Sequence, residues 1–212
     1  MEKCPNCDAP LKSGVFNSNS LIHKSNTEII NEFAENKQKD YCFKCSSNLL
    51  EGSKNRLTIQ IIELNKKLTE LLPLIPVITV QSPYDWNYKI INMVTAQSVT
   101  GTGAFAEFAS SITDLLGTQS NRYSTKLANG ENLCFSQLRL KALEVGGNAI
   151  IATDIDYTEV GGDKGMLMVC MSGTVVKLEN CDVLGNDYGD RFNELNSTMQ
   201  DLTRLKNLDG IE

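Results

Sequence analysis

Long apolar runs are missing from this sequence of 212 residues. No segment approaches the roughly 20 consecutive apolar residues that a bilayer-spanning helix needs. The first residues, from Met1 to Pro5, also lack the apolar stretch of a secretory signal. We therefore expect a cytoplasmic protein without a membrane anchor. With 41% hydrophobic and 22% charged residues, the chain has room for one moderate core and a small appendage.

Histidine is nearly absent, and the common phosphate-binding glycine patterns are missing. His23 is the only histidine and lies far from the C-terminal half, so a histidine-dependent triad in that half is excluded within one chain. Gly101-Thr102-Gly103 is followed by no third glycine or lysine at the spacing of a phosphate loop, and predicts a turn. Because no other pattern indicates a catalytic site, we predict that the protein is not an enzyme.

The sequence also lacks a large excess of basic over acidic residues. Ten basic and nine acidic residues give segment 1–72 a net charge of +1, and ten basic and 17 acidic residues give segment 73–212 a net charge of −7. Nucleic-acid affinity usually needs a strongly basic surface. We therefore expect no nucleic-acid partner.

Cysteine is present in a pattern typical of metal binding. Seven cysteines include Cys4-Pro5-Asn6-Cys7 and Cys42-Phe43-Lys44-Cys45. An odd number of cysteines argues against a disulfide framework, and two C-x-x-C pairs complete a tetrahedral shell of four sulfurs that suits zinc. Iron in the same geometry, four unligated thiols and two redox pairs remain as alternatives. His23 is a weak substitute ligand because it lacks suitable spacing.

The predicted zinc site is structural, because four protein ligands leave no position for an activated water or a substrate. The surrounding segment is polar and lacks the apolar residues for a core of its own. It therefore needs a bound metal ion to stay folded. The 34 residues between the pairs exceed common zinc-ribbon spacings. A capping box at Ser25–Glu28 predicts a short helix within that segment.

Apolar periodicity predicts the remaining elements. Helices are expected over segments 54–72, 105–116, 122–145 and 187–208. Strands are expected over segments 88–99, 148–157 and 166–178, with a short extended strand at 77–80 and a glycine-rich hairpin at 159–165. The main domain then has the order β-α-β-β, which is an α+β layer.

This order predicts four parts: a zinc ribbon with a helical insertion at 1–52, an amphipathic linker helix and linker at 53–76, an α+β oligomerisation domain at 77–180, and a C-terminal amphipathic helix at 187–208.

A second candidate metal site lies in the main domain. Asp154 and Asp156 are two apart on an expected strand, so their carboxylates project from one face, with Glu159 close beyond. Such a group suits a hard or borderline cation. Acidic residues at a strand end are more often solvated or paired with basic residues, and this alternative stays open.

Several stretches between residues 88 and 178 resemble the YbjQ-like family, which is also catalogued as heavy-metal-binding. The matching stretches are Val99–Gly103, Tyr123–Leu127, Gly146–Ile151, Asp154–Tyr157, Met166–Val169 and Ser172–Thr174. The resemblance implies a β-α-β-β subunit, similar to that of dodecin, that assembles into a ring, typically a homopentamer. It carries no defined set of metal ligands onto this sequence.

Three hypotheses about function follow. The first is a zinc-containing, ring-forming binding or scaffold protein that meets a protein partner through its ribbon. The second is a metal-handling protein that binds an exchangeable heavy-metal ion through Asp154, Asp156 and Cys170. An enzyme with a site between subunits ranks third.

Overall fold

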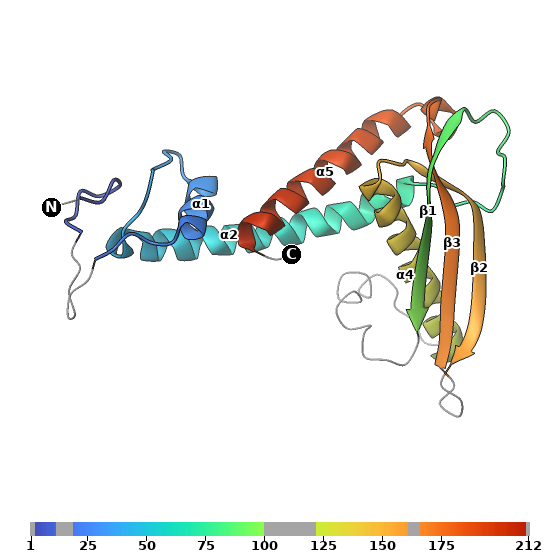
Figure 1. Ribbon diagram of the computed structural model, residues 1–212, viewed down its shortest axis with the longest axis horizontal. Coiled ribbons are helices and arrows are strands. Elements are labelled where there is room, and N and C mark those ends of the chain that lie inside the picture. The colour runs from blue at the N-terminus through green and yellow to red at the C-terminus, as the bar shows by residue number, and fades with distance from the viewer. Residues whose placement is uncertain (1–2, 12–18, 100–121, 161–165, 211–212) are drawn as a thin grey trace. The chain divides into compact units, whose positions relative to one another are not determined.

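The structure, a computed structural model, describes residues 3–11, 19–99, 122–160 and 166–210 (Figure 1). It divides into two compact units, which we call the N-terminal unit (Met1–Asn65 with Thr198–Glu212) and the sheet unit (Lys66–Ser197). The expected helix at 105–116, the turn at 101–103 and the tip of the hairpin lie outside the described residues. None of the helices in the described ranges is long and apolar enough to cross a membrane.

The sheet unit is built on three antiparallel strands in the order β1-β3-β2. The strands are β1 (Tyr88–Val99), β2 (Ala149–Val160) and β3 (Met166–Leu178). The predictions for β1 and β3 are confirmed to the residue, and β2 extends three residues beyond the predicted end. The chain therefore has the predicted α+β class.

Helix α4 (Arg122–Glu144) packs against β1 and β3 and covers one face of the sheet (Figure 1). Its inward side chains include Cys134, Leu138 and Ala142, all fully buried. Gly130 lies within this helix, where a Cβ would stand 3.2 Å from Cγ2 of Val169. A glycine here lets the helix approach the sheet closely, which offsets its low helix propensity.

Among the described residues, a second layer covers one end of the opposite face of the sheet. There Ala149, Ile151 and Val176 form a buried cluster against Ile78 and Trp86. The predicted strand at 77–80 is confirmed only in part, because it is reduced to an isolated parallel bridge between Val77 and Ile150. Farther along the same face of β3, the alternating residues Met166, Met168 and Cys170 are only half-buried.

The start of α5 (Tyr188–Asp209) is fixed to the sheet unit by a buried hydrogen bond. The Tyr188 hydroxyl donates to the backbone oxygen of Asn148 at 2.7 Å. Burial raises the pKa of Tyr188 well above its ordinary value, because the phenolate would lose its hydration. The Tyr188 ring stacks on Phe192, over which the ammonium of Lys177 lies.

The N-terminal unit has a small core made by three helices. Ile29 of α1 (Lys24–Phe33), Leu57 of α2 (Phe43–Leu71) and Leu205 of α5 form a buried cluster. The predicted stripes of α2 and α5 are therefore confirmed as packing faces.

Two helix starts differ from the prediction. Helix α1 is capped by His23, whose Nδ1 accepts from the Ser25 backbone amide, so Ser25 is not the cap. Helix α2 begins at Phe43 and not near Lys54. Buried serines, Ser46 and Ser53, continue the inward stripe of α2 toward its start, and their polarity hides the periodicity from a search for apolar residues.

Candidate metal centre

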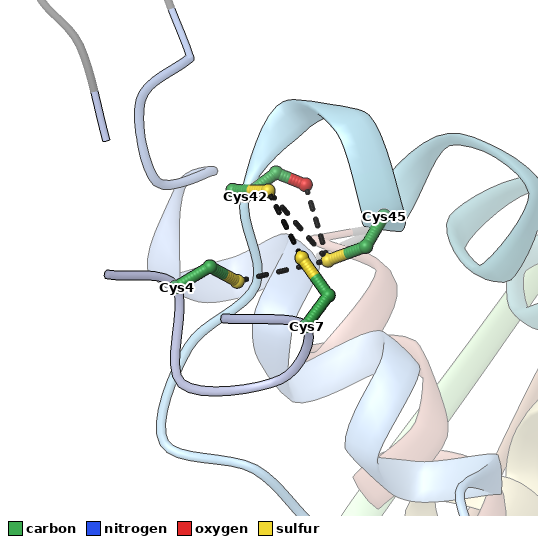
Figure 2. A group of neighbouring side chains, drawn as sticks. All are labelled: Cys4, Cys7, Cys42 and Cys45. Atoms are coloured by element: carbon green, nitrogen blue, oxygen red, sulfur yellow. Dashed lines mark hydrogen bonds between the residues drawn. The ribbon is translucent and has the colours of Figure 1, made fainter. Parts of the chain in front are cut away.

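The first cysteine pair lies on a tight turn. The backbone amide of Asp8 donates to the Cys4 carbonyl at 3.0 Å, and the Cys4 amide donates to Ala9 at 2.9 Å. Asp8 has a left-handed backbone, with φ of 56°, which aspartate tolerates better than most residues. The turn brings Cys4 and Cys7 to the same side of the chain (Figure 2).

The second pair lies at the N-terminus of α2, with Cys42 just before the helix and Cys45 in its first turn. The Cys42 carbonyl accepts hydrogen bonds from the backbone amides of Cys45 and Ser46, at 3.1 and 3.0 Å. The prediction of a ribbon is wrong for this pair, because Cys45 lies in a helix. The free amides and dipole of a helix N-terminus favour the thiolate form of a cysteine.

A third segment holds the two pairs together. Leu21 forms an antiparallel bridge with Cys42, the Phe43 amide donates to the Ser20 carbonyl at 3.0 Å, and the Ile22 amide donates to Tyr41 at 2.9 Å. These bonds lay residues 19–22 along residues 41–43. The Asn19 side chain links this segment to the loop of the first pair, because its Nδ2 donates to the Pro10 carbonyl.

The four sulfur atoms point toward one another (Figure 2) and all lie within 4.8 Å of each other. The distances Cys4–Cys45, Cys7–Cys42 and Cys42–Cys45 are 3.8, 3.7 and 3.8 Å. A tetrahedral ion with metal–sulfur bonds of about 2.3 Å requires sulfur–sulfur distances of about 3.8 Å. The residues present therefore fit a four-sulfur metal ion, whereas a disulfide would need about 2 Å.

The surroundings of the thiols shift their pKa values in different directions. Burial by itself would raise the pKa of Cys42, but the nearby polar groups, first among them the Cys45 amide, outweigh it, and the pKa falls to about 6. A hydrogen bond from the Ala9 backbone amide lowers the pKa of Cys7, but burial and the neighbouring sulfurs outweigh it and raise the pKa to about 12. Ionising all four thiols at this spacing requires a cation among them.

The other residues considered from the sequence lie elsewhere. Asp154, Asp156 and Glu159 are exposed on β2, where Asp154 pairs with Ser172 and Asp156 with Cys170 across the strands. Within the described ranges, the four cysteines are the only group of three or more His, Cys, Asp or Glu side chains that lie close enough together to hold a metal. The second metal site stays a prediction. His23 caps α1 and does not join the cysteines.

Asn19 is a residue of the centre that the sequence alone did not indicate. Its side chain is buried, and its Nδ2 donates to the Pro10 carbonyl at 3.1 Å, on the loop of the first cysteine pair. It follows no motif and stands 23 positions before Cys42 in the sequence. Only the folded path of segment 19–22 brings it to the metal centre.

Fold and site together define a protein with a four-cysteine cluster that fits a metal ion and an α+β domain. Residues 76–179 match the family model YbjQ_1, described as "Putative heavy-metal-binding". The resemblance of this segment to the YbjQ-like family is therefore confirmed, and the match begins where Pro76 and Val77 pair with β2.

Among solved structures, the chain is similar to a DUF74-family protein of unknown function from Pediococcus pentosaceus ATCC 25745. The two are 18% identical, the match covers 49% of this chain and 96% of that one, and the TM-score is 0.32. A likeness at this level carries no conclusion about fold or function.

Proposed function

We propose that the protein is a zinc-stabilised, self-assembling binding or scaffold protein of the cytoplasm, without catalytic activity. The carrying observation is the cluster of Cys4, Cys7, Cys42 and Cys45, whose sulfur spacing matches a tetrahedral zinc site. Four protein ligands complete that shell, so the ion serves to hold the module together. The exposed surface of this module would then meet a protein partner.

The edge of the sheet supports self-assembly. Strand β1 is an edge strand, and its Ile90 and Met93 side chains are 71% and 67% exposed. Apolar side chains on an unpaired edge favour pairing with another chain. The YbjQ-like resemblance implies a homopentameric ring, so a second copy of this chain is the partner proposed for this edge. A ring multiplies the metal module, and weak contacts by each copy become avid together.

Sedimentation velocity of the full chain tests the assembly. The wild type is expected to sediment as one oligomer at micromolar concentration, and Ile90→Lys with Met93→Lys to shift it to smaller species. Tyr84→Lys is the matched control, because Tyr84 is 90% exposed and lies outside the strands. A wild-type monomer, or equal effects of both variants, would contradict assembly through β1.

Metal handling by the sheet unit is a second candidate function. The family description favours it, and the cross-strand pair of Asp156 and Cys170 supplies one carboxylate and one thiol on neighbouring strands. Calorimetric titration of the chain with Cys4→Ser and Cys42→Ser tests it, because the four-sulfur site is then disabled. Stoichiometric binding that Asp156→Asn with Cys170→Ser abolishes would support this function. No binding before that second change would contradict it.

A further inference from the structure

The outer edges of the sheet are open over most of their length. Strands β1 and β2 flank β3 (Figure 1), and among the described residues no strand pairs with the outer edge of β1. At β2, the backbone of segment 76–80 forms hydrogen bonds with residues 150–153. Beyond them, residues 154–160 of β2 have β3 as their one neighbouring strand among the described residues. Both open edges can therefore accept a strand of another chain.

The two open edges differ in charge. Residues 154–160 contain three carboxylates and no basic side chain, whereas β1 has no acidic side chain and its Lys89 is paired with Glu179. Lys141 of α4 adds a cation beside β1, because its Nζ donates to the Thr95 carbonyl. Lys141 is exposed, and neither it nor a carboxylate of residues 154–160 forms an ion pair with another described residue. These charges are thus available to a partner.

The strand register places the opposite charges level with each other. Ser172 of β3 is the partner of Thr95 on one side and of Asp154 on the other. Lys141, which donates to Thr95, therefore lies level with Asp154, on the opposite edge of the sheet. Asp156 follows two residues further along the same edge.

The strand directions allow these two edges to meet. Strands β1 and β2 are both antiparallel to β3, so they run parallel to each other. A copy related by rotation about an axis along the strands would bring its β1 beside β2 of the first copy, in the same direction and at the same level. A head-to-tail contact of this kind repeats from copy to copy and can close into a ring.

The apolar half of β1 also finds a counterpart at the other edge. Through their partners on β3, Ile90 and Met93 lie level with residues 149–151, at the part of β2 that segment 76–80 covers. That segment carries Val80, whose side chain is 52% exposed. In such a contact, apolar side chains would meet at one end of the strands and opposite charges at the other.

We propose that β1 of one copy docks on the outer edge of β2 of a second copy, with its Lys141 paired to Asp154 and Asp156 of that neighbour. This inference rests on the proposed self-assembly and names the surface that β1 meets. It also gives the carboxylates of β2 a role in an interface, where complementary charges fix the register and exclude wrong pairings.

Charge reversal on each edge of the full chain tests this contact by sedimentation velocity. Asp154→Lys with Asp156→Lys, and separately Lys141→Glu, are each expected to shift the oligomer to smaller species, because like charges would then face each other. A chain that carries all three changes should recover the wild-type size, since every contact again joins opposite charges. Glu63→Lys with Asp182→Lys is the matched control, because it changes the charge equally at exposed positions outside the strands.

The outcomes separate this contact from assembly as such. If the wild type is an oligomer and the β2 variant keeps its size, β1 meets another surface, such as a second β1, and the contact with β2 is overturned. A combined variant that stays small, or a control that dissociates equally, would also overturn it. A monomeric wild type would overturn the proposed self-assembly, and this contact with it. Circular dichroism shows that each variant remains folded.

Discussion

The sulfur atoms of Cys7 and Cys42 lie 3.7 Å apart, although 34 residues separate the two cysteines in the sequence. Closing a loop of this length costs conformational entropy. Helix α1 within the loop and the bridge between Leu21 and Cys42 shorten the distance to be closed. A metal ion bound across the two pairs would hold the loop closed, because its binding free energy contributes directly to folding.

Removing a ligand is expected to release the ion and loosen the N-terminal unit. Cys4→Ser or Cys42→Ser should lose zinc and hydrogen-exchange protection across residues 3–11 and 19–23, because little apolar burial holds them without metal. Strands β1 to β3 should keep their protection. Cys170→Ser is the control that should retain the zinc. Full zinc content in Cys4→Ser would contradict the four-sulfur site.

Truncating the helical core should destabilise the N-terminal unit. Leu57→Ala is expected to cost about 2–5 kcal/mol of unfolding free energy, since Leu57 is fully buried against Ile29 and Leu205. On the same helix, Ile59 is 55% exposed, and Ile59→Ala should change stability by less than about 0.5 kcal/mol. Urea unfolding followed by helical circular dichroism measures both. Equal losses would argue against the helical core.

The hydroxyl of Tyr188 should contribute to the stability of the sheet unit. Tyr188→Phe leaves the buried oxygen of Asn148 without this donor, and we expect a loss of about 1–3 kcal/mol. Tyr157→Phe removes a hydroxyl that bonds Glu131 from a side chain that is 51% exposed, and should cost less than about 1 kcal/mol. Thermal unfolding of both variants gives the comparison. If Tyr188→Phe left the stability unchanged, this hydrogen bond would not contribute to it.

A methyl group at Gly147 should disrupt the end of α4. A Cβ there would lie 2.1 Å from Cγ1 of Val175 and 3.2 Å from the Ala142 oxygen, so the strand or the helix end must shift. We expect Gly147→Ala to cost about 1–3 kcal/mol, as overpacking does. Gly189 in α5 has open space around its Cβ position, and Gly189→Ala should be neutral or stabilising by up to about 1 kcal/mol. Denaturant unfolding that ranks the two variants in the reverse order would refute this packing.

The sequence predicted the parts of the structure that depend on local patterns. Strands β1 and β3 have β-branched residues bounded by turn signals, and their ends were found to the residue. Helix α4 ends at Glu144, one residue from its predicted end, because Gly146 adopts a left-handed backbone with φ of 81°. The cysteine cluster was found because C-x-x-C spacing is itself a geometric requirement of the metal.

The features that the sequence missed depend on contacts between distant segments. The beginning of α2 is buried at Ser46 and Ser53, and no apolar pattern reveals that burial. His23 replaces Ser25 as the cap of α1 because its imidazole nitrogen reaches the Ser25 amide. Asn19 reaches Pro10 only because two distant segments lie side by side, which neither propensity nor spacing encodes.

Native mass spectrometry of the full chain, with Cys4→Ser as comparator, tests the central claim most directly. It reports the number of chains in the particle and the zinc ions bound per chain in one experiment. The account predicts an oligomer with one zinc per chain, and none bound by Cys4→Ser. A metal-free wild type, or a variant that keeps its zinc, would contradict it.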